Sequence, residues 1–174
     1  EIDKFKDNQL EYKEQSNSFV PQLDLNVPML IPENYVKDLT SRLSLYRELA
    51  LLKNDEELNE FSERLVDRFG SLPNEVEILL KVTSVKNICI STGIDLLKIG
   101  YSRILIGFYE NNFSNPQGLM EFIQKNKNFI KVKEDKIIIT KSFNNDHDKL
   151  DFIKMLVKNF HKIKKTPSEE GASY

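Results

Sequence analysis

The chain has 174 residues, of which 40% are hydrophobic and 30% are charged. This length and composition indicate one domain with its own core, and no segment approaches the ~20 consecutive apolar residues of a membrane-spanning helix. A single cysteine, Cys89, excludes an internal disulfide and any multi-thiolate metal site. Residues 1–10 lack the apolar stretch of a signal peptide, and the chain does not open on Met. We therefore expect a cytoplasmic protein and a piece of a longer chain.

The charge is divided unevenly along the chain. Residues 1–80 hold 9 Lys/Arg and 17 Asp/Glu, a net charge of −8, whereas residues 81–174 hold 16 and 10, a net charge of +6. Such an asymmetry can steer association with a charged partner. The isoelectric point near 5.8 argues against a dedicated nucleic-acid-binding domain, because such domains are usually basic.

The N-terminal part begins with a polar segment and one strand. Residues 1–20 are polar and aperiodic, which predicts a linker. Apolar and polar residues alternate over residues 22–27, as they do in a half-buried strand. Pro28 and Pro32 keep the next segment extended, because proline disfavours helical backbone in the residue before it.

Two amphipathic helices are predicted next. Asp38 can cap the first helix. The apolar residues that we expect on its inner face are Leu39, Leu43, Tyr46 and Ala50. Asn54 followed by Glu57 resembles the capping box of a second helix, and Gly70 suits the left-handed residue after its end. The inner stripe of the second helix is expected to be Leu58, Phe61, Leu65 and Phe69.

The rest of the chain mixes helices and strands. A helix between Pro73 and Gly93 is apolar over much of its circumference, which predicts a central position. The later elements are expected to be strands at 95–99 and 103–109, a helix starting at Asn115–Pro116, a hairpin of 129–132 and 136–140 turning at Glu134–Asp135, a helix capped by Asn145 or Asp146, and a disordered tail over 166–174.

This order of elements lacks the regular strand–helix–strand alternation of a parallel sheet. It predicts an α+β fold, with a helical N-terminal half and, in the C-terminal half, a small, mostly antiparallel sheet with further helices. We expect a single domain over residues 21–165.

Patterns for catalysis and cofactor binding are missing. The six glycines form neither a dinucleotide-binding motif nor a phosphate loop. Cys89 falls on an apolar helix stripe, where a free cysteine behaves as a small hydrophobe. Asn144, Asp146 and Asp148 have the spacing that opens a calcium loop, but Lys149 stands at the sixth position, where that loop needs glycine. We predict no catalytic residue, no bound cofactor and no metal ligand.

A basic helix face is one candidate for function. Four lysines with spacings of four, four and three share one face of the last helix: Lys154, Lys158, Lys162 and Lys165. Such a face could contact nucleic-acid phosphates in a salt-dependent way. It is also what an ordinary solvated helix surface looks like.

Two segments resemble a known family. The first is Ile31–Asp38 with Arg42–Arg47 after it, and the second is Leu65–Pro73, which contains Asp-Arg-Phe-Gly-Ser-Leu-Pro. Together they resemble the C-terminal domain of the bacterial transcription-repair coupling factors, over about residues 22–163. The resemblance implies that residues 1–20 are the linker from a translocase motor, and that this domain is not itself catalytic.

In that family the full protein is an ATP-dependent DNA translocase that displaces stalled RNA polymerase and recruits nucleotide-excision repair. The resemblance implies that this domain packs on the excision-repair homology module of the same protein. It thereby hides the surface that binds the damage-recognition ATPase. Such autoinhibition is an intramolecular contact that biases a two-state equilibrium.

The residues expected at this interface lie on the second helix. They are Glu60, Glu63, Arg64, Asp67 and Arg68. The family's pattern runs Glu-Leu-x-Asp-Arg-Phe-Gly, and Arg64 stands where that glutamate usually is, with Glu63 one position earlier. Asp67 is the best single candidate for a contact with a basic partner surface. Alternatively, Asp67 forms a local charge pair with Arg64 or Arg68.

Overall fold

A computed structural model describes residues 19–166 of the chain. The elements are β1 (Gln22–Asp24), α2 (Leu39–Leu51), α3 (Asp55–Phe69), α4 (Asn74–Thr92), β2 (Ile94–Ile99), β3 (Arg103–Phe108), η1 (Tyr109–Asn111), α5 (Pro116–Lys125), β4 (Ile130–Lys133), β5 (Lys136–Thr140) and α6 (Asp146–Lys165). The linker predicted over 1–20, except its last two residues, and the tail predicted over 166–174, except its first, lie outside the described residues. None of the described helices is long and apolar enough to cross a membrane.

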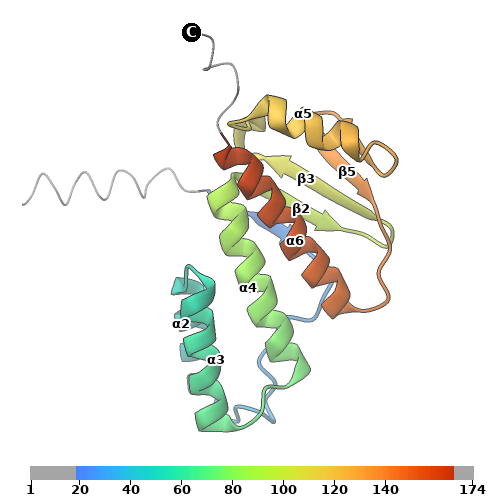
Figure 1. Ribbon diagram of the computed structural model, residues 1–174. Helices are drawn as coiled ribbons and strands as arrows, with labels where there is room; N and C mark the ends of the chain where they lie inside the picture. The colour runs from blue at the N-terminus through green and yellow to red at the C-terminus, as the bar shows by residue number, and fades with distance from the viewer. Residues whose placement is uncertain (1–18, 167–174) are drawn as a thin grey trace, which may run out of the picture.

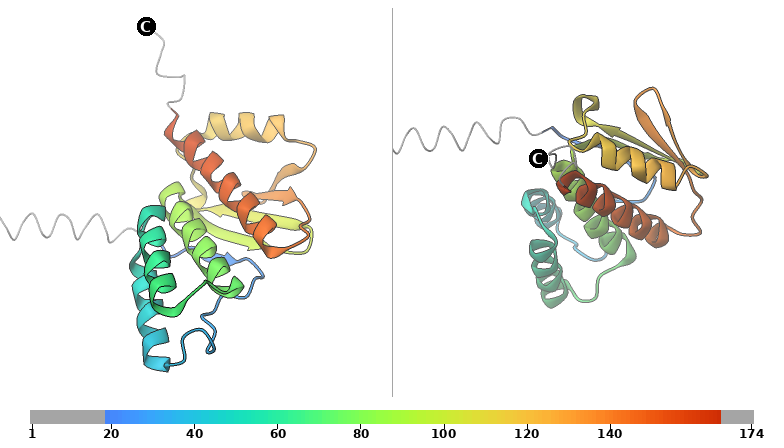
Figure 2. Two further views of the ribbon diagram at one scale, coloured as in Figure 1. Left: turned by 60° about the horizontal axis from the view of Figure 1, so that its bottom comes forward. Right: turned by 45° about the horizontal axis from the view of Figure 1, so that its top comes forward.

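The molecule combines a sheet covered by helices with a pair of helices, α2 and α3, which we call the helical arm (Figure 1). Helices α4, α5 and α6 lie on one face of the five-stranded sheet, and the paired helices α2 and α3 lie beside α4. Figure 2 shows the same layering from two further directions. The predicted α+β fold, with its helical N-terminal half, is therefore confirmed.

The strands follow the order β1-β2-β3-β5-β4. Strand β1 pairs with β2 in parallel, and every other neighbouring pair is antiparallel. Leu97, Ile106 and Ile137 are aligned by this register on the face that α4 and α6 cover, and all three are buried. This alternation of buried and outward residues follows from the two-residue period of a strand.

Two apolar clusters hold the fold together. The larger one joins the covered sheet face to α4 and α6, with Phe160 and Ile78 fully buried. The smaller one joins α2 and α3 to the start of α4 and to the extended segment around Ile31. Helix α4 contributes to both clusters, which fits its predicted central position, because a helix apolar all round has to be covered on several sides.

The expected inner face of α2 is wrong. Leu39 is 60% exposed and Leu43 is 45% exposed, whereas Leu45 and Leu49 are buried. The apolar residues of this short helix lie on more than one side of it, so the sequence contains more than one apolar stripe with helical spacing. Packing against α3 selects the stripe that contains Leu45 and Leu49.

The predicted N-terminal caps are confirmed. Asp38 caps α2, Asn54 caps α3, and Asn145 caps α6 by accepting a hydrogen bond from the N–H of Asp148. Gly93 follows α4 in the left-handed conformation, with φ of 84° and ψ of 20°. Gly70 follows α3 with a positive φ of 92°, but its ψ of −168° lies outside the predicted left-handed conformation.

Candidate partner interface

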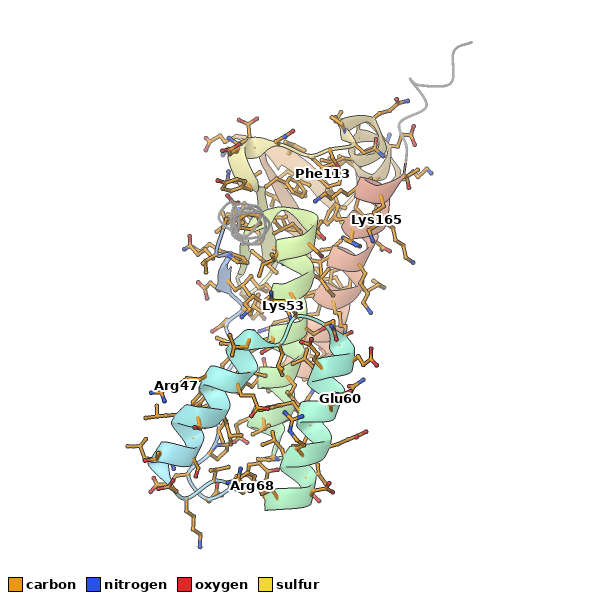
Figure 3. The ribbon with its side chains drawn as sticks, turned by 90° about the vertical axis from the view of Figure 1, so that its left-hand side faces the viewer. Arg47, Lys53, Glu60, Arg68, Phe113 and Lys165 are labelled. Atoms are coloured by element: carbon orange, nitrogen blue, oxygen red, sulfur yellow. The ribbon has the colours of Figure 1, made fainter. Side chains whose placement is uncertain are left out.

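Helix α3 presents an exposed row of carboxylates. Its members recur at spacings of four, three and four residues and are all exposed: Glu56, Glu60, Glu63 and Asp67. We call these four residues the acidic row. Residues three and four apart lie above one another on a helix, so the row follows the length of α3 on one side. Figure 3 shows Glu60 on the outer side of this helix, with its side chain directed away from α2.

The opposite face of α3 fixes the position of the row. Leu58, Phe61 and Leu65 are buried in the smaller apolar cluster. At the N-terminus, the side chain of Asn54 accepts from the N–H of Glu57 at 2.9 Å, and the side chain of Glu57 accepts from the N–H of Lys53 at 2.7 Å. Glu57 is thereby used in capping and does not belong to the exposed row.

The C-terminal end of α3 is held by Tyr35. Its hydroxyl donates to the carbonyl of Gly70 at 2.8 Å, and the carbonyl of Leu65 lies 3.2 Å away, where it shares the same proton. Burial raises the pKa of Tyr35, which keeps the hydroxyl a donor. Asp67 lies between these two anchored positions, so the backbone beneath it is restrained while its side chain is in solvent.

The two predicted arginines are turned away from Asp67. Arg64 forms an ion pair with Glu48 of α2, and the guanidinium of Arg68 lies 4.9 Å from the ring centre of Phe69. Figure 3 shows Arg68 near the lower end of α3. Among residues 19–166, neither arginine is ion-paired with Asp67, so the alternative of a local charge pair is not what the structure forms.

The acidic row lacks counter-charges within the described part of the chain. The ion pairs found there involve Glu48, Glu77, Asp55, Asp146 and Asp151, and no member of the row. Like charges three or four residues apart on a helix repel one another. The row therefore costs some helix stability and offers a site for a basic surface.

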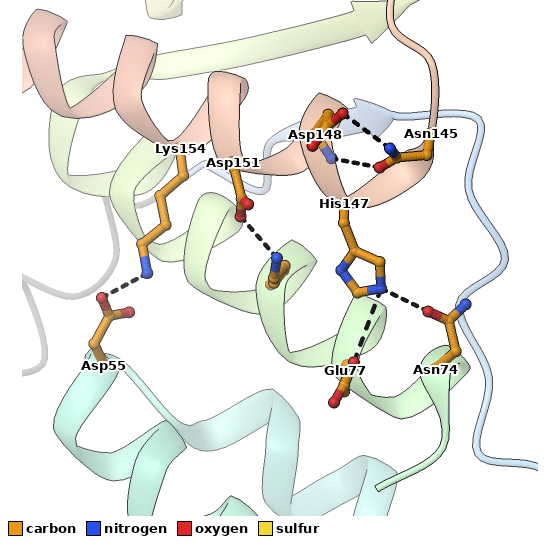
Figure 4. A network of polar contacts seen from close by, with 9 residues as sticks. Asp55, Asn74, Glu77, Asn145, His147, Asp148, Asp151 and Lys154 are labelled. Carbon is orange, nitrogen blue, oxygen red and sulfur yellow. Dashed lines mark hydrogen bonds and ion pairs between the residues drawn. The ribbon is translucent and has the colours of Figure 1, made fainter.

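One of the four lysines on the predicted face of α6 is ion-paired within the domain, and the other three are exposed. Lys154 forms an ion pair with Asp55 at 2.9 Å (Figure 4), whereas Lys158, Lys162 and Lys165 are exposed. Burial raises the pKa of Asp55, but the hydrogen bonds from Ser84 and Lys154 outweigh it and hold that pKa below its ordinary value. A contact between these lysines and nucleic acid stays a prediction, with Lys154 already occupied.

A polar network joins α6 to the other helices (Figure 4). Lys81 of α4 pairs with Asp151 at 2.7 Å, and His147 contacts Asn74 at 2.5 Å and Glu77 at 3.8 Å. Sequence reasoning did not identify this network, because its partners are about 70 residues apart. Each contact is partly exposed and contributes modestly, but together they fix α6 against α4 and the start of α3.

Two candidates from the sequence, the lone cysteine and the possible metal ligands, can be placed in the structure. Cys89 is fully buried, and burial raises its pKa to about 12, so the thiol stays neutral. Within residues 19–166 there is no cluster of three or more His, Cys, Asp or Glu side chains that could hold a metal ion.

Known proteins are similar to this chain in sequence and in fold. The TRCF domain model matches residues 25–119, more than half of the chain. The transcription-repair-coupling factor of Rickettsia bellii is 34% identical over 139 residues, which cover 80% of this chain and 11% of that protein. The transcription-repair-coupling factor of Escherichia coli K12 is 34% identical over 104 residues, which cover 60% of this chain and 9% of that protein.

The chain thus spans about a tenth of the length of these curated relatives. A crystal structure of the C-terminal domain of transcription-repair coupling factor superposes with a TM-score of 0.73. The superposition covers 87% of this chain and 98% of that one at 18% identity, which establishes a shared fold. The chain therefore belongs to the TRCF domain family.

Proposed function

We propose that this domain is a non-catalytic regulatory module of a transcription-repair coupling factor. It packs on the excision-repair homology module of its own protein through the acidic row of α3. In that position it masks the surface that recruits the damage-recognition ATPase, until the protein engages stalled RNA polymerase on DNA. The domain performs this role without a bound cofactor.

The observation that carries the proposal is the acidic row of α3, which forms no ion pair within residues 19–166 and lies on a helix held at both ends by hydrogen bonds. Four exposed carboxylates without ion pairs in the described residues are complementary to a basic surface. Charge complementarity of this kind sets register and specificity more than raw affinity. The family membership supports the same assignment, because the relatives are transcription-repair-coupling factors of which the matched part is only about a tenth.

Arg64 is compatible with this interface. It stands where the family pattern has a glutamate, but its charge is neutralised by Glu48 of the neighbouring helix. The pair adds no net positive charge beside Asp67, while Glu63, which is exposed, supplies a carboxylate one position earlier. The side of α3 that carries the row therefore stays acidic.

A weak contact is sufficient for this autoinhibition. We call the intramolecular contact between α3 and the excision-repair homology module the lock. A tether that matches the span between two modules gives an effective concentration near the millimolar range. A contact with a Kd of tens of micromolar would then keep the lock closed most of the time. Engagement of polymerase has only to favour the open state by a few kcal/mol to reverse this balance.

The proposal predicts a gain of recruitment when the acidic row is reversed. In the full-length protein, Glu63→Lys with Asp67→Lys should raise binding of the damage-recognition ATPase without polymerase by about tenfold or more, because repulsion opens the lock. Glu121→Lys on α5 is the matched control, since this glutamate is also exposed but lies on another helix. Unchanged recruitment by a folded double variant would contradict the masking role.

A further inference from the structure

The second face of the sheet is left uncovered by the described helices. Helices α4, α5 and α6 all lie on the other face (Figures 1 and 2). The register of the strands defines which residues the uncovered face carries. Its apolar residues are Leu96, Leu105 and Ile138, and its basic residues are Lys98, Arg103, Lys131, Lys133 and Lys136. We call this set of eight residues the basic sheet face.

The three apolar residues form a stripe across the central strands. Ile138 of β5 pairs with Leu105 of β3, and Leu96 follows on β2 beside Gly107. All three are only partly buried, and none of them belongs to the two apolar clusters of the fold. Their side chains therefore contribute little to the core and are available on the surface.

Basic side chains border this stripe. In the strand register, Lys131 lies next to Ile138 and Lys98 lies next to Leu105. The stem of Lys136 lies across Gly107, where an added Cβ would approach it to 3.0 Å. A long side chain can cover apolar surface with its stem while its charge stays in water.

The charges on this face are unbalanced. Among the paired positions of β1 to β5 on this face, Asp24 is the one acidic residue, and within residues 19–166 none of the five basic residues takes part in an ion pair. Lys133 and Lys136 pair directly across the β4–β5 hairpin, and like charges in that position are destabilising. The Nζ of Lys136 donates to the side-chain oxygen of Asn111 at 3.2 Å, but no carboxylate within residues 19–166 forms an ion pair with either lysine. A like-charge pair that is kept without a counter-charge points to a functional surface.

We propose that the basic sheet face is a second docking surface, which binds an acidic polypeptide segment that carries aliphatic side chains flanked by Asp or Glu. The aliphatic stripe receives the apolar side chains, and the surrounding cations pair with the carboxylates. A nucleic acid fits less well, because single strands bind open sheets by stacking bases on aromatic rings. The three apolar residues of the basic sheet face are aliphatic, and none of its eight residues is aromatic.

This surface is separate from the acidic row. Helix α3 packs on the helical side through α4, whereas the basic sheet face lies on the far side of the sheet from α4. The two surfaces also have opposite charge. The domain can therefore hold a basic partner on α3 and an acidic partner on the sheet at the same time.

The test is a titration of the chain, labelled with ¹⁵N, with a synthetic helical peptide that has a leucine stripe flanked by glutamates. Amide shifts are expected to cluster at Leu96, Leu105 and Ile138. Lys131→Glu with Lys136→Glu should weaken binding about tenfold or more. Lys125→Glu with Lys127→Glu makes the same charge change at exposed positions outside the strands and should leave binding unchanged.

Three outcomes would overturn the proposal. Shifts located elsewhere would show that the peptide uses another surface. Equal binding of a peptide with lysines in place of the glutamates would remove the electrostatic basis. Binding of a short DNA duplex, lost in the Lys131→Glu, Lys136→Glu variant while the acidic peptide fails to bind, would assign the face to nucleic acid. The spectrum of each free variant reports whether it is folded, and the single exposed change Lys131→Glu replaces the double variant if that one unfolds.

Discussion

Asp55 connects the helical arm to the rest of the molecule through one side chain. Its carboxylate accepts hydrogen bonds from Ser84 at 2.5 Å and from Lys154 at 2.9 Å. Desolvation raises its pKa, but these hydrogen bonds and the charges of Lys154 and Lys158 together lower it below the ordinary value of 3.8. The ionised form of Asp55 therefore stabilises the folded state.

This shift predicts a pH-dependent contribution to stability. A carboxyl with a lowered pKa in the folded state contributes fully above its ordinary pKa, and the contribution disappears as the pH falls through the folded-state pKa. Asp55→Asn should reduce the free energy of unfolding at pH 7 and flatten its decline below about pH 4. Urea unfolding at several pH values measures both effects. Asp67→Asn, at an exposed position without an ion pair in the described residues, is the control, and an equal acid slope in wild type and Asp55→Asn would contradict the assignment.

Single residues also mark the limit of prediction from sequence. The spacing of Glu60, Glu63 and Asp67 is enough to place them on one helix face, because helical periodicity is a local property. The ion pair of Arg64 with Glu48 depends on how α2 packs against α3. No pattern within either segment indicates that pairing, so the sequence leaves Arg64 as an interface candidate or as an alternative partner of Asp67.

At the scale of elements, the β4–β5 hairpin has a turn that its residues fit poorly. Glu134 and Asp135 have φ of 51° and 59°. A two-residue turn with positive φ at both positions favours Asn-Gly, since most side chains are strained there. Glu134→Asn with Asp135→Gly should therefore raise the free energy of unfolding by about 1 kcal/mol.

Chemical denaturation of wild type and variant measures this change. The reversed order, Glu134→Gly with Asp135→Asn, is a useful comparison, because it has the same composition but places glycine at the less favoured position. A loss of stability in the Asn-Gly variant would show that the turn does not have this conformation in solution.

Helix caps and turns can be predicted from a few neighbouring residues, whereas the pairing of strands can be predicted only in part. The caps at Asp38 and Asn54 and the hairpin turn are encoded within a few neighbouring residues, and all three occur as expected. The parallel pairing of β1 with β2 joins residues that are over 70 positions apart. Alternation over residues 22–27 predicts a strand but carries no information about its neighbour.

At the scale of the whole molecule, the uneven charge of the sequence becomes two separated surfaces. The acidic row lies on α3 in the N-terminal half, and the basic sheet face is built mainly from strands of the C-terminal half. The ion pair of Lys154 with Asp55 and the smaller apolar cluster hold the helical arm against the helices on the sheet, while the contacts of Lys81 and His147 hold α6 against α4. A partner bound at either surface therefore meets one connected body.

This arrangement suits the proposed lock. A tethered domain needs only a weak contact to stay docked. Exposed carboxylates also make that contact sensitive to salt, since charges in solvent are screened within about 10 Å at 0.1 M ionic strength. The lock is therefore expected to close firmly only while both modules belong to the same protein.

The most direct test is a calorimetric titration of this chain with the separately prepared excision-repair homology module of the same protein, at low and at moderate salt. We expect weak binding that salt weakens further, that Asp67→Lys abolishes without unfolding the domain, and that Glu121→Lys leaves unchanged. Absence of binding by the folded chain at every salt concentration, or binding that Asp67→Lys does not alter, would contradict the claim that the acidic row of α3 forms the lock.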